Sequence, residues 1–500
     1  MPTPYDELPY PGSAFAQTHP DRLATLATLF GMTPAPVERC RVLELGCGDG
    51  GNLIPMAFGL PESRFTGVDL ATTAIARGQQ LISQVGLANI SIQNADLMDL
   101  DSGFGEYDYI IAHGLYSWVP PQVRERILDI SKSHLAPHGV AFISYNAYPG
   151  GHLRDTIHEM MRFHTRDTAG PREKVQKARE LLEFLVAAHP EQDAYSAFLR
   201  SELASFLERK PEHFYHDELS EHNHRFYFHE FMRDASRHRL QFLSEARLLS
   251  TQTGAFPADV IAKIAAFSQG DDLVRQQYLD FLKLRTFCQS LLCHAGVRLE
   301  RAADPARITT MFAATEAHPA SSDPDICSTS AEEFKYPSGG SMSTNHPLAK
   351  ASILHLGRIW PKAISFHELL QIARTLSQRN TEPLEEDTAW LSDLILRLYA
   401  ANFLELHVHQ PVFTSEPSEK PVASLLARVQ VQTSSIVTTL RHTSIEVADE
   451  AARQLLLRLD GTRNREQLQL ELGELAVNEI TAEQLERNLQ MLANRALLVA

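Results

Sequence analysis

The sequence predicts an α/β protein built on a doubly wound parallel sheet, and three observations support this fold class. An apolar strand, 41–45, leads into a glycine cluster, 46–51, and then into a helix-compatible stretch. Apolar strand and helix go on alternating up to about residue 150. Polar or aromatic residues follow the strands at their carboxyl ends, where sheets of this kind bind ligands. We therefore expect a ligand site along that edge of the sheet.

The composition agrees with a multi-domain globular protein and excludes several other classes. The chain has 500 residues, of which 44% are hydrophobic and 22% charged. Its apolar runs are shorter than the ~18 residues that a membrane helix needs, so we expect no membrane contact. Five scattered cysteines without zinc-ligand spacing suggest reduced thiols and a cytoplasmic location. A net charge of −16 argues against nucleic acid as a partner.

The glycine cluster is the first candidate binding element. Gly46 and Gly48 allow a tight turn and let a ligand approach the main chain closely. The helix start beyond them offers free N–H groups and the positive end of a helix dipole. Together with Gly51 they also match the G-x-G-x-x-G fingerprint, so the turn alone leaves nicotinamide-dinucleotide binding open.

The second and third strands each end in polar residues. The second, 64–70, has Asp69 at its end, roughly 20 residues beyond the glycine turn, where such units place a carboxylate for ribose hydroxyls. A helix, 72–86, follows. The third strand, 90–93, ends at the run N-A-D-L, residues 94–97.

The fourth and fifth strands end in aromatic runs. The fourth, 107–112, is followed by H-G-L-Y-S-W-V-P and by a helix, 121–134. The fifth, 140–144, is followed by Y-N-A-Y-P-G-G. Both runs are expected at the edge of the sheet that binds ligands.

Three of these segments carry a resemblance to a known class. E-L-G-C-G-D-G at 44–50, G-V-D-L at 67–70 and N-A-D-L at 94–97 resemble the S-adenosylmethionine-contacting motifs of class I methyltransferases. A nicotinamide-dinucleotide site explains the glycines but not the acids Glu44 and Asp96. The resemblance implies a Rossmann-like, seven-stranded methyltransferase sheet and S-adenosyl-L-methionine as the cofactor.

The same resemblance assigns the cofactor-binding residues. Glu44 and the Gly46–Gly48 backbone would hold the methionine moiety, Asp69 the ribose, and Asp96 with Leu97 the adenine. The full set implied is Glu44, Gly46, Gly48, Asn52, Asp69, Leu70, Asn94, Ala95, Asp96, Leu97 and His113.

A longer pattern resembles a narrower group, the bacterial methyltransferases with a methyltransferase regulatory domain, which include rickettsial outer-membrane-protein lysine methyltransferases. The leader Y-D-E-L-P-Y-P, the run H-G-L-Y-S-W-V-P and the run S-Y-N-A-Y-P-G-G carry it. The resemblance implies a protein lysine acceptor and a homodimer. Nucleobase amino-methyltransferases have N/D-P-P-aromatic after strand four, so the sequence disfavours base flipping.

The aromatic runs predict the acceptor side. Methyl transfer to lysine needs alignment and a neutral amine, and an apolar channel lowers the lysine pKa from about 10.4. Tyr116 and Trp118 are the candidate catalytic residues, with His113 as a cofactor-orienting group or proton acceptor. Tyr145, Asn146 and Tyr148 are the candidate substrate contacts. The alternative is that Trp118 and Tyr148 pack a domain seam and that His113 satisfies the backbone.

Residues 1–150 are expected to form the cofactor domain, and 151–320 a helical insert and regulatory region. Strands within 222–320 should complete the sheet, and 297–314 is the candidate for its last strand. Histidines between 213 and 229 lie around a predicted loop and lack metal-ligand spacing. We expect a polar inter-domain seam there and no metal.

Residues 321–344 are predicted to be a linker, and 345–500 a domain of two winged-helix-like units. Their third helices mix acids with few arginines, which predicts packing or protein interaction and not DNA binding. The leader, 1–20, is expected either to lie over the mouth of the cofactor site or to cover an apolar patch.

Three hypotheses on function follow. The first is methyl transfer to a protein lysine. The second is a small-molecule acceptor. The third is a non-catalytic S-adenosylmethionine-binding scaffold or sensor, which the intact acids Glu44, Asp69 and Asp96 disfavour.

Overall fold

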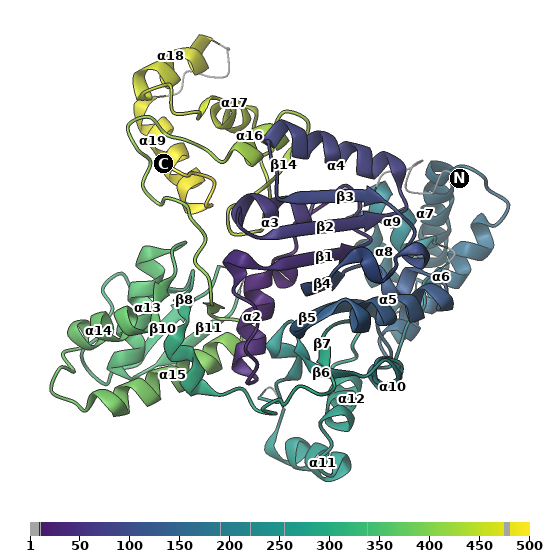
Figure 1. The fold of residues 1–500 in the computed structure, drawn as a ribbon, viewed down its shortest axis with the longest axis horizontal. Coiled ribbons are helices and arrows are strands. Elements are labelled where there is room, and N and C mark those ends of the chain that lie inside the picture. Colours follow the sequence, from purple (N-terminus) through teal and green to yellow (C-terminus); the bar gives the residue numbers. More distant parts are fainter. Residues whose placement is uncertain are drawn as a thin grey trace.

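The computed structural model describes residues 10, 12–190, 192–220, 222–254, 256–337, 339–474 and 481–500. The first part of the predicted leader, including Tyr5, lies outside these residues. Figure 1 shows a central sheet, with the helical insert at one end and the C-terminal units at the other.

The central sheet has seven strands in the order β3-β2-β1-β4-β5-β7-β6. The first five run parallel, while β7 is antiparallel to both of its neighbours, β5 and β6. This confirms the predicted seven-stranded doubly wound sheet. The strands are β1 (Arg41–Leu45), β2 (Arg64–Asp69), β3 (Ile90–Asn94), β4 (Tyr107–Ala112), β5 (Leu135–Asn146), β6 (Leu240–Glu245) and β7 (Phe287–His294).

Helices cover both faces of the sheet, and each face has its own apolar core. On one face, Leu26 of α2 (Pro20–Leu29) and Met56 of α3 (Leu53–Gly59) pack in a core that α4 (Thr72–Val85) also joins. On the other, Leu128 of α5 (Pro121–Ser133) packs with Phe231 of α10 (Phe228–Arg237). Burial of both faces explains why the strands are almost continuously apolar.

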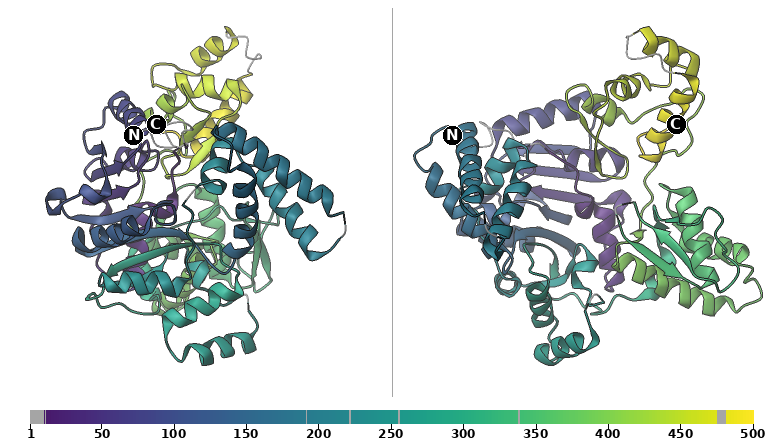
Figure 2. Two further views of the ribbon diagram at one scale, coloured as in Figure 1. Left: turned by 90° about the vertical axis from the view of Figure 1, so that its right-hand side faces the viewer. Right: turned by 180° about the vertical axis from the view of Figure 1, so that it is seen from behind.

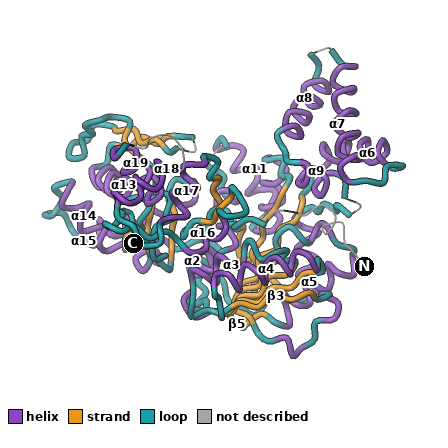
Figure 3. The backbone as a smooth tube through the Cα atoms, turned by 90° about the horizontal axis from the view of Figure 1, so that it is seen from above, coloured by secondary structure: helices purple, strands orange, loops and turns teal. Residues whose placement is uncertain are grey.

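The helical insert stands apart from the sheet. Figures 2 and 3 show α7 and α8 projecting away from it. Its core includes Ile157, Leu182, Phe206 and Phe214. Its helices are α6 (Gly151–Thr165), α7 (Pro171–Ala188), α8 (Ala194–Leu207) and α9 (Pro211–Glu218), and two more, α11 (Ala258–Ser268) and α12 (Asp272–Leu282), lie between β6 and β7.

Two sequence expectations differ from the structure. The last strand of the sheet is β7, and 297–314 contributes only β8 (Phe312–Ala314), which pairs with β12 (Ile364–Ser365) and β13 (Glu405–His407) in a separate sheet. The expected linker, 321–344, contains two strands that pair with each other, and the first of them also pairs with β9 (His318–Pro319). These strands are β10 (Glu332–Lys335) and β11 (Ser341–Thr344).

The first C-terminal unit has its own core around Leu348, Phe366 and Leu391. His407 Nδ1 lies 2.7 Å from Asp21 Oδ2 and ties this unit to α2. Its helices are α13 (Pro347–Ile359), α14 (Phe366–Leu376) and α15 (Leu384–Ala400).

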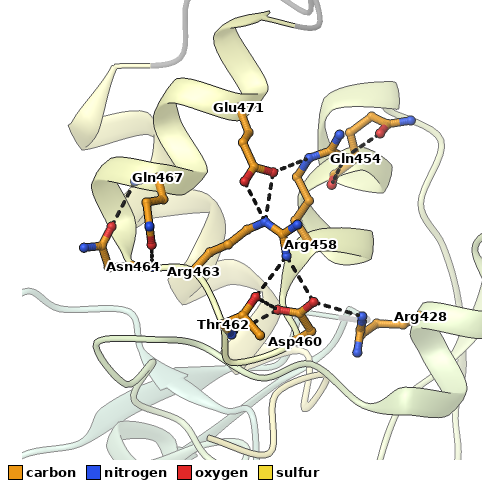
Figure 4. A network of polar contacts seen from close by, with 9 residues as sticks. All are labelled: Arg428, Gln454, Arg458, Asp460, Thr462, Arg463, Asn464, Gln467 and Glu471. Atoms are coloured by element: carbon orange, nitrogen blue, oxygen red, sulfur yellow. Dashed lines mark hydrogen bonds and ion pairs between the residues drawn. The ribbon is translucent and has the colours of Figure 1, made fainter.

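The second C-terminal unit has an apolar core around Leu456 and Leu489, and ion pairs connect two of its helices and the loop between them. Glu471 accepts from Arg463 Nε at 2.8 Å and lies 3.3 Å from Arg458, while Asp460 pairs with Arg463 and Arg428 (Figure 4). These arginines are engaged within the unit, whereas a phosphate backbone needs available cations. The elements are α16 (Leu425–Gln430), β14 (Ile436–Thr438), β15 (Ser444–Glu446), α17 (Glu450–Arg458), α18 (Arg465–Glu474) and α19 (Ala482–Asn494).

All five cysteines are free thiols. Within the described part of the chain, no helix is long and apolar enough to cross a membrane.

Candidate active site

A cavity of about 1930 Å³ lies along the carboxyl ends of β1 to β4 and extends toward the regulatory region. We use two names for its sides. The cofactor wall is formed by Glu44, Gly46, Gly48, Asp69, Leu70, Ala95, Asp96 and Leu97, and the acceptor wall by His113, Trp118, Asn146, Glu218, Asn223 and Arg225.

The glycine turn at the end of β1 has the geometry that only glycine adopts easily. Gly46 and Gly48 have φ values of 72° and 56°, in the left-handed region. A Cβ on Gly46 would lie 3.0 Å from Leu115 Cδ1. The Gly48 N–H donates to Asp69 Oδ2 at 2.8 Å, which locks the turn against the end of β2.

Glu44 contributes a deeply buried carboxyl group to the cofactor wall. Its side chain is only 4% exposed, and Oε1 accepts from Asn52 Nδ2 at 2.7 Å. Oε2 is buried and meets no hydrogen-bond partner among the described residues. Burial raises the pKa of Glu44 to about 8, although the bond from Asn52 opposes this shift. A ligand that brings a cationic N–H donor fits this oxygen.

The ends of β2 and β3 supply the rest of the cofactor wall. Asp69 Oδ1 accepts from the Ala71 N–H at 2.7 Å, and Asp96 Oδ1 accepts from the Met98 N–H at 2.9 Å. The predicted residue Asn94 does not line the cavity. It is exposed and donates to the carbonyls of Asp69 and Leu70, so it supports the end of β2 instead.

The described part of the leader lies over the cavity. Gly12, Ser13, Phe15 and Gln17 line it, and a Cβ on Gly51 would lie 2.6 Å from Gly12 Cα. The leader therefore covers the glycine turn, as one of the two sequence interpretations expected.

Asn52 joins three separate parts of the chain. Its Oδ1 accepts from the Phe15 N–H at 3.0 Å and from His442 Nε2 at 3.0 Å. Its Nδ2 donates to Glu44 and, at 3.0 Å, to Thr18 Oγ1. Sequence reasoning missed His442, because nothing in its local pattern points to a residue almost 400 positions away.

His113 lines the cavity as a neutral imidazole. Its Nδ1 lies 2.9 Å from Ser144 Oγ, and its ring meets Phe15 edge-on at 4.2 Å. Burial lowers the pKa of His113 to about 4. It is therefore uncharged near neutral pH and a weak proton acceptor.

Asn146 and Trp118 line the cavity as the sequence predicts. Asn146 Nδ2 donates to Asn223 Oδ1 at 2.8 Å, and the Asn146 N–H donates to Ser117 Oγ at 2.8 Å. Both the backbone and the amide group of Asn146 are thus held in place.

The predicted aromatic channel is reduced to Trp118, because Tyr116, Tyr145 and Tyr148 do not line the cavity. Tyr116 and Tyr145 are 2% and 1% exposed and pack around Phe231. Tyr148 stacks on His152 at 3.9 Å, and its hydroxyl donates to Asp155 at 2.9 Å. Successive side chains of a strand point to opposite faces, so Tyr145 faces α10.

The polar stretch around residue 220 supplies part of the acceptor wall. Glu218, 2% exposed, accepts from Arg209 Nη1 at 2.6 Å, and burial raises its pKa to about 7. Arg225 is buried and pairs with Asp155. In the sequence, these residues lie in or beside the polar run between 213 and 229, which predicts a polar inter-domain seam. Across the described ranges, no group of three His, Cys, Asp or Glu side chains is arranged to hold a metal.

The sheet order with an antiparallel β7, and the acid-glycine turn that ends β1, define a class I methyltransferase. Three family models match the chain. They describe a methyltransferase domain at 42–139, a "predicted methyltransferase regulatory domain" at 210–294 and a "PKMT, C-terminal winged helix domain" at 419–497.

Proteins of two Rickettsia species are similar to this chain over most of its length. Protein RP789 of Rickettsia prowazekii is 33% identical over 493 residues, which cover 96% of this chain and 87% of RP789. The structure of PKMT2 from Rickettsia typhi matches with a TM-score of 0.88 at 28% identity, over 98% of this chain and all of PKMT2. A structure of PKMT2 in complex with AdoHcy matches with a TM-score of 0.87. The chain belongs to the S-adenosylmethionine-dependent class I methyltransferases that carry this regulatory domain and the PKMT winged helix.

Proposed function

We propose that the protein transfers the methyl group of S-adenosylmethionine to a lysine amine of a protein. The observation that carries the cofactor part is the buried Glu44 Oε2, which lies beside the left-handed glycine turn and meets no hydrogen-bond partner in the described part of the chain. The lysine part is supported by the resemblance of the leader and the two aromatic runs to rickettsial lysine methyltransferases. The likeness to PKMT2 over nearly the whole chain agrees with it.

The cofactor wall fits the groups of this cofactor. Glu44 Oε2 would accept from its amino group, and the Gly46–Gly48 turn lets its methionine part approach the main chain. Asp69 would accept from the ribose hydroxyls, and Ala95, Asp96 and Leu97 would surround the adenine. When bound, the cofactor supplies a methyl group activated by a positively charged sulfur.

The acceptor wall would hold the amine. A lysine must lose its proton before it can attack, and desolvation in a closed cavity lowers its pKa. The Trp118 ring can attract the cationic form of the side chain. Asn146, oriented by Asn223, offers Oδ1 to an amine N–H. His113, with its low pKa, is better suited to position groups than to remove a proton.

The cavity is large enough to hold an acceptor beside the cofactor. At about 1930 Å³ it exceeds the roughly 300–1,000 Å³ usual for small-molecule sites. Beyond the cofactor, room remains for a lysine and its neighbouring residues.

Incubation of the protein with methyl-labelled S-adenosylmethionine and a bacterial proteome tests the proposal. Label on protein, recovered as methyl-lysine after hydrolysis, is expected, and it should be strongly reduced with the Asp69→Ala variant at limiting cofactor. Label found only in the small-molecule fraction would show that the acceptor is a small molecule and not a protein. Cofactor binding without transfer to either fraction would favour a non-catalytic scaffold.

A further inference from the structure

We infer that His442, in the C-terminal winged-helix unit, is a positioning residue for the cofactor, acting through Asn52 on Glu44. The inference rests on the proposed function of Glu44 as the cofactor's carboxylate partner. It makes the C-terminal unit part of the cofactor site.

The contact is direct and buried. His442 is 5% exposed, and its Nε2 lies 3.0 Å from Asn52 Oδ1. Asn52 Nδ2 in turn lies 2.7 Å from Glu44 Oε1. Two hydrogen bonds therefore connect the C-terminal unit with the carboxylate that lines the cavity.

The hydrogen-bond chemistry fixes the direction of this chain. Asn52 Oδ1 can only accept, so His442 Nε2 carries the hydrogen. Burial, with His19 as a neighbour at 5.1 Å between ring centroids, keeps the pKa of His442 well below its usual value. His442 is therefore a neutral donor. No group in the described parts of the chain meets its Nδ1, which leaves this one bond as the polar contact of the ring.

This donor and the Phe15 N–H together determine which way the Asn52 amide points. An amide has nearly the same shape when its oxygen and nitrogen are exchanged. With His442 and the Phe15 N–H both donating to Oδ1, Nδ2 faces Glu44. The exchanged orientation would place Oδ1 against Glu44 Oε1 and turn the Nδ2 donor toward the donating Phe15 N–H. His442 thus favours the orientation that holds Glu44 in position.

The turn that presents His442 is itself well anchored. His442 has a φ of 55°, and its N–H donates to the Thr439 carbonyl at 3.0 Å. Next to it, the Arg441 guanidinium lies 3.8 Å from the centre of the Trp360 ring and pairs with Glu405. The Ala14 N–H of the leader donates to Ser444 Oγ at 3.0 Å.

The unit also packs directly on the cofactor domain. Leu426 of α16 joins a small apolar cluster with Ile54 of α3 and Val85 of α4. Figure 1 shows α16 and β14 beside these two helices. The second C-terminal unit thus packs on α3 and α4 in addition to the contact between His442 and Asn52.

Calorimetry with S-adenosylhomocysteine as the probe tests the inference on the full chain. His442→Phe keeps a ring but removes the donor, and His442→Gln restores an N–H donor. We expect His442→Phe to raise the Kd about five- to tenfold, and His442→Gln to stay within twofold of the parent. In turnover assays the loss should fall on KM for the cofactor and not on kcat.

Matched variants separate a positional effect from a packing effect. Glu446→Gln, exposed on the same hairpin, is expected to leave the Kd unchanged. In an Asn52→Ala background, His442→Phe should add nothing. An equal further loss in that background, or no rescue by glutamine, would overturn the inference. If the phenylalanine variant does not fold, His442→Leu takes its place in the same comparison.

The test also distinguishes this inference from the proposed function. An unchanged Kd in His442→Phe, together with a weakened Kd in Glu44→Gln, would overturn the role of His442 alone. A parent protein that neither binds S-adenosylhomocysteine nor transfers methyl groups would overturn the proposed function as well.

Discussion

The cofactor wall and the acceptor wall of the same cavity are built in different ways. The cofactor wall comes from the ends of three strands that are neighbours in the sheet and lie between residues 44 and 97. The acceptor wall combines the loop after β4, the end of β5 and the stretch 218–225. The first wall is therefore a local product of strand-turn-helix units, whereas the second exists only once the insert packs against the sheet.

The two walls also differ in what holds their polar groups. Main-chain N–H groups anchor Asp69 and Asp96 of the cofactor wall. Asn146 and Glu218 of the acceptor wall are anchored by the side chains of Asn223 and Arg209. Substitutions should therefore separate into effects on cofactor binding and effects on turnover.

The largest expected effect is the loss of cofactor affinity in Asp69→Ala. Removal of a hydrogen-bonding charged group costs roughly 1.5–3 kcal/mol, which corresponds to about a 10- to 150-fold higher Kd. Calorimetry with S-adenosylhomocysteine measures it, with circular dichroism as a check on folding. The exposed Asp99, which lies outside the cavity, provides the control variant Asp99→Ala. Unchanged affinity in Asp69→Ala would contradict the assignment of the cofactor wall.

Asn146→Ala should act on the other wall. We expect kcat to fall about 10- to 100-fold, because a misaligned amine loses the in-line geometry, while the cofactor Kd stays within twofold. Steady-state kinetics with a protein substrate identified by methyl labelling measures kcat, and calorimetry measures the cofactor Kd. A parallel loss of cofactor affinity would show that the two walls are not separable at this residue.

The pH dependence of binding sharpens the role of Glu44. Its pKa of about 8 means that the carboxyl is largely protonated below pH 8 in the free protein. A cationic amino group binds the deprotonated form, so the Kd should rise as the pH falls from 8 to 6, by up to about tenfold per pH unit. Glu44→Gln should bind more weakly at pH 8 and should lack this dependence. A parent Kd that is flat over this range would argue against a direct contact.

The smallest effects are expected for tyrosines that belong to neither wall. Tyr116→Phe and Tyr148→Phe should each change kcat less than twofold, because these side chains face the core and Asp155 respectively. Unfolding experiments should instead detect a modest loss for Tyr148→Phe, about 1 kcal/mol for its hydrogen bond. A tenfold fall in kcat for Tyr116→Phe would place this residue in the acceptor wall after all.

The sequence by itself determined the cofactor half of the protein. Alternating strands and helices predict the sheet, and the acids and glycines that end its first three strands predict the cofactor wall. This succeeds because β1, β2 and β3 are adjacent, so local order becomes spatial order. Asn94 is the exception, since only the structure shows that its amide is used by the end of β2.

Tertiary structure alone decided the rest. Tyr145 and Asn146 are consecutive, yet the alternation of β5 sends one into the core and the other into the cavity. The packing of α10 on the sheet decides which of its two faces becomes the core that receives Tyr145. The antiparallel β7 follows a long helical segment in the chain and is the last strand to join the sheet, a role that was expected for residues 297–314. The His442–Asn52 contact joins residues 390 positions apart, a pairing that only the packing of the C-terminal unit on α3 and α4 creates.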